Sequence, residues 1–399
     1  MSKILKKFKL SSSMRQIFNL LKTRFSIGYP DKFTAKDEGT NKIKILILTD
    51  NFSATYYLAF HYPLQSLIAR SQVLLTVLSQ KCVISKVGSR KPTIILNELL
   101  VSEAPNIVIF NRYGLPYGSI FLELCKKHGI PTIYFIDDDL LNIPTFLGSE
   151  IQKQHGNTKI INERQYLLAH VDLIYTSTRY LNNFISQIFP KQQVVHSIYP
   201  PYLEFLISKN KHQVSITRNN FKFGYMGSKG HQKDLEMVTP AIIQILQNYP
   251  DSEFETFGTI SLPEKLSAFG NRVTSRKAVQ NYDNFLNCLY NLNWDLGIAP
   301  LENHNFNFCK SPVKYLEYTA SGIPTIASNI LVYNQTINNM QNGILSEENE
   351  WYENIELVIN RPDLRQEMLR QAQKQCSQEF ALSITSEKVF SIVSSIRRK

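Results

Sequence analysis

Short apolar runs alternate with helical stretches along most of the chain. The run at 41–50 opens with polar residues and ends in Thr49-Asp50, which is the pattern of a buried parallel strand. Similar runs follow at 106–110, 131–139, 172–178 and 193–199, and helical stretches lie between them at 56–69, 93–102, 119–129 and 162–170. Strand followed by helix, repeated in this way, predicts a parallel sheet with both faces covered.

This rhythm stops at 199–220, which holds two adjacent prolines and then a polar stretch, and it starts again at Phe221. The second set of predicted strands lies at 221–228, 253–259, 271–276, 294–300 and 323–328. Further helices are predicted at 234–250, 282–292, 311–322, 361–380 and 386–399. We therefore predict an α/β fold of two tandem Rossmann-like, doubly wound domains that face a cleft.

The predicted domain boundaries follow the breaks in this pattern. An N-terminal extension takes 1–40, the first Rossmann-like domain takes 41–205, and a linker takes 206–220. The second Rossmann-like domain takes 221–380, and a final helix at 381–399 is expected to pack back on the first domain. Ligands usually bind where the carboxyl ends of two such sheets face each other, so strand ends are the places to look for a site.

Composition narrows the class of protein. A length of 399 residues and an apolar content of 43% suit a globular chain with two cores. No run approaches the ~18 apolar residues that span a bilayer, and the basic start lacks the apolar core of a signal peptide. The five cysteines are scattered, with no CxxC pair and no metal-ligand spacing. They are expected to be reduced thiols of a cytoplasmic protein that has no metal site.

The net charge of +11 is concentrated at the N-terminus, because residues 1–33 hold eight basic side chains and one acid, a net +7. No nucleic-acid recognition motif accompanies this charge, and no nucleic-acid partner is expected. An apolar stripe at helical spacing runs through the same segment: Met14, Ile17, Phe18, Leu21 and Phe25. A basic amphipathic segment of this kind predicts binding to an anionic membrane surface. The alternative is that the stripe packs on the first domain while the lysines face water.

One segment has a dense motif. Residues 310–328 read KSPVKYLEYTASGIPTIAS, in which Glu317 opens a frame that continues through Ala320, Gly322, Pro324 and Ala327. This frame resembles the donor-binding segment of GT-B-fold glycosyltransferases, in particular the retaining family 4. The resemblance covers 221–345 closely and 41–200 in outline.

The resemblance implies a role for Glu317, which in that family accepts hydrogen bonds from the ribose hydroxyls of a nucleotide-sugar. A carboxylate suits this role because its two oxygens take two hydroxyl donors in charge-assisted bonds. The family usually has a second glutamate eight positions earlier, where this chain has Cys309. Lys310 and Lys314 lie beside these positions and are expected to meet a diphosphate or a sugar hydroxyl. The alternative is that both lysines only solvate the helix.

A second stretch, 223–242, resembles the opening strand, glycine loop and helix of the same donor domain. Small residues would let backbone N–H groups approach a phosphate at this turn: Gly227, Ser228 and Gly230. Lys229 or Lys233 would add positive charge. His231 and Asp234, three positions apart, resemble a T-H-x-x-D element of some bacterial branches. Alternatively, Asp234 is an ordinary helix N-cap.

Three aspartates, residues 137–139, end a predicted buried strand, and such a cluster is costly unless its charge is used. One interpretation is a D-x-D metal site of another glycosyltransferase fold. The family resemblance favours a second interpretation. Members of the family have a His-Asp pair at the end of a strand that faces the cleft, and Asp138 and Asp139 align with this histidine and aspartate. There they would orient the acceptor hydroxyl or stabilise an oxocarbenium-like transition state. A solvated strand end without function is the third.

The expected function is transfer of a sugar from a nucleotide-sugar to a saccharide or lipid-linked acceptor, with no cofactor. The alternatives are a non-catalytic nucleotide- or carbohydrate-binding protein of the same fold and a nucleotide-sugar epimerase. Catalysis is assigned to Asp138 and Asp139. Donor binding is assigned to a set of seven residues: Gly227, Ser228, Lys229, His231, Lys310, Lys314 and Glu317.

Overall fold

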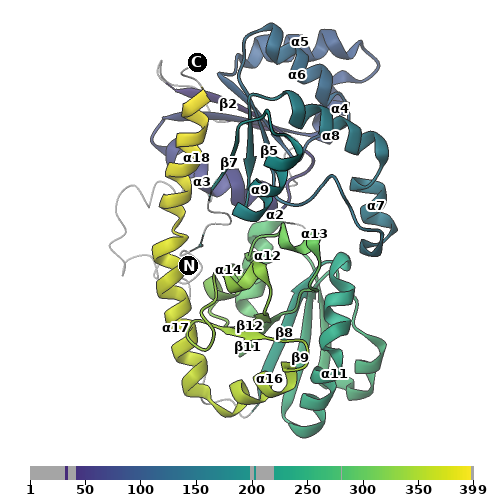
Figure 1. Ribbon diagram of the computed structural model, residues 1–399, viewed down its shortest axis with the longest axis vertical. Coiled ribbons are helices and arrows are strands. Elements are labelled where there is room, and N and C mark those ends of the chain that lie inside the picture. Colours follow the sequence, from purple (N-terminus) through teal and green to yellow (C-terminus); the bar gives the residue numbers. More distant parts are fainter. Residues whose placement is uncertain (1–31, 35–41, 198–201, 204–219, 280, 397–399) are drawn as a thin grey trace, which may run out of the picture.

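The computed structural model describes residues 32–34, 42–197, 202–203, 220–279 and 281–396, and its elements form two α/β units, one above the other in Figure 1. Most of the predicted N-terminal extension and of the predicted linker lies outside these residues. None of the described helices combines the length and the apolar composition that crossing a bilayer requires.

The first unit is built on a seven-stranded sheet with the order β1-β3-β2-β4-β5-β6-β7. Its neighbouring strands are parallel, except that β1 pairs antiparallel with β3 at one edge. The strands are β1 (Lys32–Thr34), β2 (Ile43–Thr49), β3 (Val73–Ser79), β4 (Ile107–Asn111), β5 (Thr132–Ile136), β6 (Leu173–Thr176) and β7 (Val194–His196).

Helical segments connect these strands and cover both faces of the sheet. They are α2 (Ala54–Tyr56), the π-helical η1 (Tyr57–His61), α3 (Tyr62–Ala69), α4 (Gln80–Val87), α5 (Pro92–Glu103), α6 (Gly118–Lys127), the 3₁₀ turn η2 (Thr145–Leu147), α7 (Ser149–His155), α8 (Thr158–His170) and α9 (Arg179–Ile188).

The second unit is built on a six-stranded parallel sheet with the order β10-β9-β8-β11-β12-β13. The strands are β8 (Phe221–Gly227), β9 (Ser252–Gly258), β10 (Val273–Lys277), β11 (Leu296–Ala299), β12 (Thr325–Ser328) and β13 (Ile344–Ser346). The helical segments are η3 (Lys229–His231), α11 (Gln232–Asn248), η4 (Glu264–Arg272), α12 (Tyr282–Asn291), α13 (Asn305–Phe308), α14 (Val313–Ala320), α15 (Leu331–Asn334), α16 (Trp351–Asn360), α17 (Pro362–Glu379) and α18 (Leu382–Ile396).

Side chains of β2 enter two different cores in turn, as the two-residue period of a strand requires. Ile45 and Ile47 join one apolar cluster, whereas Leu46 and Leu48 join another on the opposite face of the sheet. The first of these clusters continues into the second unit, where the rings of Tyr57 and Tyr282 meet with centroids 5.6 Å apart. Apolar packing therefore holds the two units together behind the cleft.

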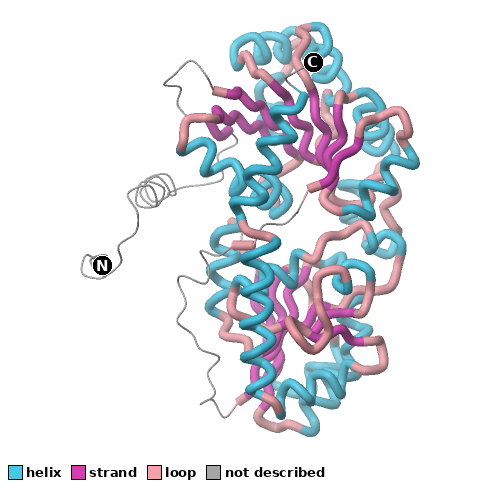
Figure 2. The backbone as a smooth tube through the Cα atoms, turned by 60° about the vertical axis from the view of Figure 1, so that its left-hand side comes forward, coloured by secondary structure: helices cyan, strands magenta, loops and turns pink. Residues whose placement is uncertain are grey.

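The last two helices run along one side of the molecule, as the yellow segments of Figure 1 and the view in Figure 2 show. α17 packs against α14 of the second unit, and α18 packs against α3 of the first. The last described helix therefore lies on the first unit.

The alternation predicted from the sequence is confirmed in both units. β3 and β13 are absent from the sequence predictions. The run that forms β3 leads directly into α4, and periodicity alone does not separate a short buried strand from a buried helix. β1 places Lys32–Thr34, which belonged to the predicted extension, at the edge of the first sheet.

Candidate active site

A cavity of about 220 Å³ lies between the two units. Its lining includes residues within two positions of strand ends in both sheets: Arg112 after β4, Asp138 after β5 and Ser228 after β8. Parallel strands bring their carboxyl ends to one edge, so these side chains converge although they are far apart in sequence. The cavity brings together four of the nine predicted site residues: Asp138, Ser228, His231 and Lys310.

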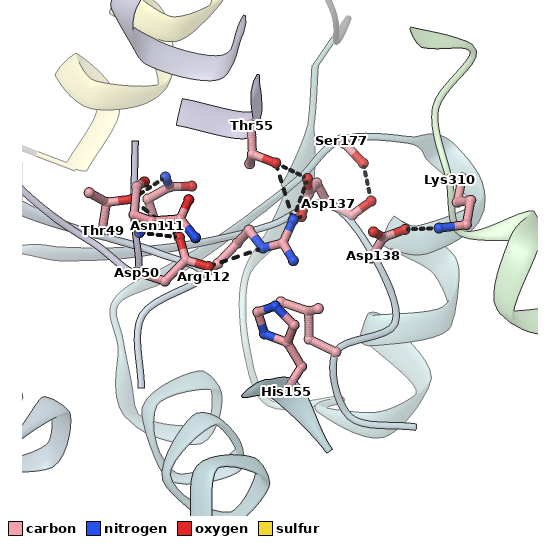
Figure 3. A network of polar contacts seen from close by, with 12 residues as sticks. Thr49, Asp50, Thr55, Asn111, Arg112, Asp137, Asp138, His155, Ser177 and Lys310 are labelled. Atoms are coloured by element: carbon pink, nitrogen blue, oxygen red, sulfur yellow. Dashed lines mark hydrogen bonds and ion pairs between the residues drawn. The ribbon is translucent and has the colours of Figure 1, made fainter. Parts of the chain in front are cut away.

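Asp138 and Lys310 form an ion pair across the cleft, with Oδ1 and Nζ 3.4 Å apart (Figure 3). Each side chain is about one-fifth exposed, so the pair is open to the cavity. The Lys310 ammonium also lies 4.7 Å from the ring centroid of Phe306. One wall of the cavity therefore carries a carboxylate and the other an ammonium group, within reach of the same ligand.

Asp137 belongs to a buried network that the sequence did not reveal (Figure 3). Its Oδ2 accepts a 2.7 Å hydrogen bond from Thr55 Oγ1, and its Oδ1 lies 3.3 Å from Arg112 Nη1. Arg112 Nε also lies 3.8 Å from Asp50 Oδ2. Burial raises the pKa of Asp137, and the Arg112 guanidinium opposes this rise. The network fixes Arg112 at the cavity wall.

Asp139 does not line the cavity. Its Oδ1 accepts hydrogen bonds from the backbone N–H of Leu141 (3.3 Å) and Asn142 (3.1 Å), and Asn142 Nδ2 donates to both of its oxygens. The carboxylate therefore holds the turn after β5. The three aspartates point to three different partners, and within the described ranges no group of three or more His, Cys, Asp or Glu side chains is placed to hold a metal ion.

His231 lies at the cavity wall and pairs with Asp234, with Nδ1 and Oδ2 2.6 Å apart. Asp234 Oδ1 accepts a 2.8 Å hydrogen bond from the backbone N–H of Glu302. α11 begins at Gln232 with His231 at the capping position, so Asp234 is not the N-cap. Its carboxylate instead ties the loop after β8 to the loop after β11.

Of the other glycine-loop residues, Gly230 also lines the cavity, whereas Gly227 and Lys229 do not. The Gly227 carbonyl accepts hydrogen bonds from the N–H of Thr259 and Ile260, at 3.1 and 3.2 Å. A Cβ on Gly227 would lie only 3.0 Å from the Tyr225 ring, which explains the small residue there. Lys229 reaches across to the first unit, where its Nζ lies 3.3 Å from Glu150 Oε2 in an exposed ion pair.

Glu317 and Lys314 are buried on α14 and do not reach the cavity. The Tyr282 hydroxyl donates a hydrogen bond to Glu317 Oε1. Burial raises the pKa of Glu317 to about 7, although the Tyr282 hydrogen bond and the Lys314 ammonium oppose the rise. Burial lowers the pKa of Lys314 to about 8, and the Lys310 charge adds to this effect.

The raised pKa predicts a pH-dependent stability. The pKa of Glu317 is about 7 in the folded chain and 4.5 in the unfolded chain, so between these pH values only the folded chain keeps the proton. The free energy of unfolding therefore falls as pH rises through that interval. From pH 5 to pH 7.5 we expect the unfolding free energy of the wild type, minus that of Glu317→Gln, to fall by about 2 kcal/mol. Urea unfolding of both proteins measures this difference. Groups that titrate in both proteins, such as buried histidines, contribute equally to the two free energies and cancel. A difference that stays flat with pH would mean that the carboxyl titrates normally.

Sequence reasoning missed Arg112, His155 and Tyr282. Arg112 had a signal, because it directly follows a buried strand and therefore lies at a carboxyl end. His155 ends α7, a short helix with no buried residue of its own, and no periodicity marks it. Tyr282 is one of 20 tyrosines, and its contact with Glu317 joins positions 35 residues apart.

No family model matches the chain, and no curated protein matches its sequence. Its structure is similar to HepE of Anabaena in complex with UDP and glucose, at 15% identity and a TM-score of 0.61 over 88% of this chain and 100% of that one. It is also similar to sucrose-phosphate synthase of Thermosynechococcus elongatus, at 11% identity and a TM-score of 0.65 over 89% and 99%. A glycosyltransferase of Rickettsia africae is 14% identical, with a TM-score of 0.59 over 90% and 99%. These similarities confirm the predicted architecture of two tandem Rossmann-like domains that face a cleft, the GT-B arrangement.

Proposed function

We propose that this chain is a glycosyltransferase that moves a sugar from a nucleotide-sugar to a saccharide or lipid-linked acceptor in cell-surface glycan synthesis. The observation that carries the proposal is the interdomain cavity, which joins Asp138 from one sheet edge to Ser228, His231 and Lys310 from the other. The family 4 resemblance around Glu317 adds retention of anomeric configuration to the proposal. HepE, which shares the fold, is known in complex with UDP-glucose, so uridine nucleotides are the first donors to test.

In this proposal the donor lies across the second unit. A hollow of about 490 Å³ at the carboxyl ends of β9 and β10 offers room for the nucleoside, and Glu317 accepts the ribose hydroxyls once the Tyr282 hydroxyl has moved away. The diphosphate meets backbone N–H groups of the Ser228 loop and the ammonium of Lys310. This arrangement uses no cofactor and assigns no role to a metal ion.

The transfer breaks the bond between the anomeric carbon and the diphosphate oxygen and forms a bond from that carbon to the acceptor oxygen. The acceptor proton passes to the departing diphosphate. Asp138 orients the acceptor hydroxyl or stabilises the positive charge that develops on the sugar. Release of a nucleoside diphosphate from a panel of nucleotide-sugars, with and without crude glycolipid and oligosaccharide acceptors, tests the proposal.

One observation favours a non-catalytic binding protein as the second candidate. Cys309 stands where the family has its first glutamate, is 2% exposed and packs in the core of the first unit. Burial raises the pKa of its thiol, so it does not replace a carboxylate. Nucleotide-sugar binding without release of a nucleoside diphosphate under any acceptor would support this candidate. Conversion of the sugar without acceptor would indicate an epimerase.

The proposal includes a location: the basic N-terminal extension binds the protein to the inner face of the cytoplasmic membrane. This extension lies outside the described residues, apart from β1, and the proposal depends on its sequence. Each basic residue near an anionic surface contributes about 1 kcal/mol, and the gain fades with salt. We expect the full chain to sediment with vesicles rich in anionic lipid, to be released as salt rises, and to stay in solution once residues 1–33 are removed. Equal sedimentation of the truncated chain would assign membrane binding to another surface.

A further inference from the structure

Two histidines from different units line the same cavity. His155 ends α7 of the first unit, and His231 ends η3 of the second. In each ring Nδ1 contacts a charged side chain that can only accept or only donate a hydrogen bond. The partner therefore decides which ring nitrogen carries the proton, and with it what the ring offers to a ligand.

His231 is oriented by a carboxylate. Asp234 Oδ2 lies 2.6 Å from its Nδ1, and because an ionised carboxylate only accepts, this nitrogen carries the proton. The other Asp234 oxygen is held by the backbone N–H of Glu302 at 2.8 Å, so the carboxylate has a fixed position. Burial and the ammonium groups of Lys314 and Lys310 lower the pKa of His231 to about 4 against the pull of Asp234. The ring is neutral, and Nε2 is left as an acceptor.

His155 is oriented by a guanidinium, with the opposite result. Arg164 Nη2 lies 3.0 Å from its Nδ1, and because a guanidinium only donates, this nitrogen carries the lone pair. Arg164 is 2% exposed and is held in place by bonds from Nη1 to the carbonyls of His155 (3.1 Å) and Leu140 (3.4 Å). Burial and the nearby Arg112 and Arg164 charges lower the pKa of His155 to about 3. The ring is neutral, and its Nε2 carries a proton to donate.

The cavity therefore has one uncharged acceptor and one uncharged donor, contributed by the two units. A phosphate oxygen only accepts, so His231 has nothing to offer it, whereas a hydroxyl both donates and accepts. The volume of about 220 Å³ is below the roughly 300–1,000 Å³ of sites that take a whole drug-sized ligand, and it suits a single sugar ring. Lys310 and Lys233 also line the cavity and bring positive charge that suits a phosphate.

We propose that His231 and His155 recognise hydroxyls of the transferred sugar, His231 by accepting a hydrogen bond at Nε2 and His155 by donating one. Asp234 and Arg164 act as positioning residues that fix the two tautomers. This inference rests on the proposed function and reassigns His231 from the diphosphate to the sugar. We favour the transferred sugar over the acceptor because His231 directly follows the glycine loop of the second unit, which is proposed to bind the donor.

Matched substitutions separate hydrogen-bonding roles from bulk. Glutamine at either position offers both an amide oxygen and an amide N–H, so His231→Gln and His155→Gln should keep the sugar contact. His231→Lys offers only donors, and His155→Glu, when ionised, only acceptors. Calorimetry on the full chain would measure the affinity for UDP and for UDP-glucose, or for the nucleotide-sugar that the donor panel identifies.

We expect all four variants to bind UDP within about twofold of the wild type, which also shows that they are folded. Affinity for UDP-glucose should fall about tenfold in His231→Lys and His155→Glu and stay within about threefold in the two glutamine variants. If instead both affinities hold while transfer falls tenfold in the same pattern, the hydroxyls that the histidines read belong to the acceptor.

Two results would overturn the inference. Tighter UDP binding by His231→Lys, or loss of UDP binding by His231→Gln, would make His231 a phosphate ligand. Unchanged binding and transfer in all four variants would remove both histidines from recognition. If the wild type binds no nucleotide-sugar of the panel, the proposed function itself is overturned. If the wild type binds and transfers while the variants are unaffected, only this inference fails and the proposed function stands.

Discussion

Asp138→Asn should lower the turnover number of sugar transfer by about 100-fold, because it removes a carboxylate that lines the cavity and pairs with Lys310. Asparagine has nearly the same size and keeps one oxygen, so the change removes charge and leaves the shape. Affinity for UDP should stay within about threefold or tighten slightly, since Lys310 loses its ion-pair partner and is released toward the diphosphate. Steady-state kinetics with saturating donor and calorimetry with UDP measure the two quantities.

Asp139→Asn is the matched control, one residue further along the chain. Its carboxylate accepts bonds from Leu141 and Asn142 in the turn after β5, so its loss should lower stability more than turnover. Equal losses of turnover in both variants would argue against the assignment to Asp138 alone. A wild-type activity that disappears with a chelator and returns with manganese or magnesium would instead place a metal ion in the mechanism.

Glu317→Ala should weaken the binding of UDP by about 30-fold or more. Two charge-assisted hydrogen bonds from ribose hydroxyls are expected to be lost, and about 2 kcal/mol for the pair corresponds to this factor. Glu317→Gln keeps one acceptor oxygen and should show a smaller loss. The measurement belongs at pH 8, above the raised pKa of about 7, so that the wild-type carboxyl is ionised.

Tyr282→Phe is the informative control for this prediction. The Tyr282 hydroxyl donates a hydrogen bond to Glu317 and would compete with a ribose hydroxyl for the same oxygen. Removing it should leave UDP affinity unchanged or raise it, whereas loss of Glu317 should lower affinity. Unchanged affinity in Glu317→Ala would show that the nucleoside binds elsewhere and that Glu317 is only a buried structural acid.

Much of the fold could be predicted from local patterns. Runs such as the one that forms β2 are buried on both faces, and a strand between two helix layers has to be apolar throughout. The frame around Glu317 placed a helix, a tight turn and a strand in order, and α14, Gly322 at φ 76° and β12 follow that order. Short elements were harder: β13 has only three residues, too few to show a period.

The candidate site was predictable in its location and much less in its membership. Parallel strands present their carboxyl ends together, and the family resemblance assigned Asp138, Asp139 and the glycine loop after β8 to the cleft. Which of the aspartates faces the cavity depends on partners from elsewhere in the chain. Asp137 contacts Thr55 and Arg112, whereas Asp138 contacts Lys310, 172 positions away.

The sequence by itself determined that two largely parallel sheets follow one another along the chain, and it indicated the strand ends at which to look for a site, because these follow from short-range periodicity and from the geometry of parallel strands. Only the tertiary structure decided which side chains act together. It buried Glu317 against Tyr282, directed Asp139 into a turn, and placed His231 beside Asp234 and His155 beside Arg164. Burial and hydrogen-bond partners set the charge and the donor or acceptor role of a side chain, and both depend on packing between segments that are distant in sequence.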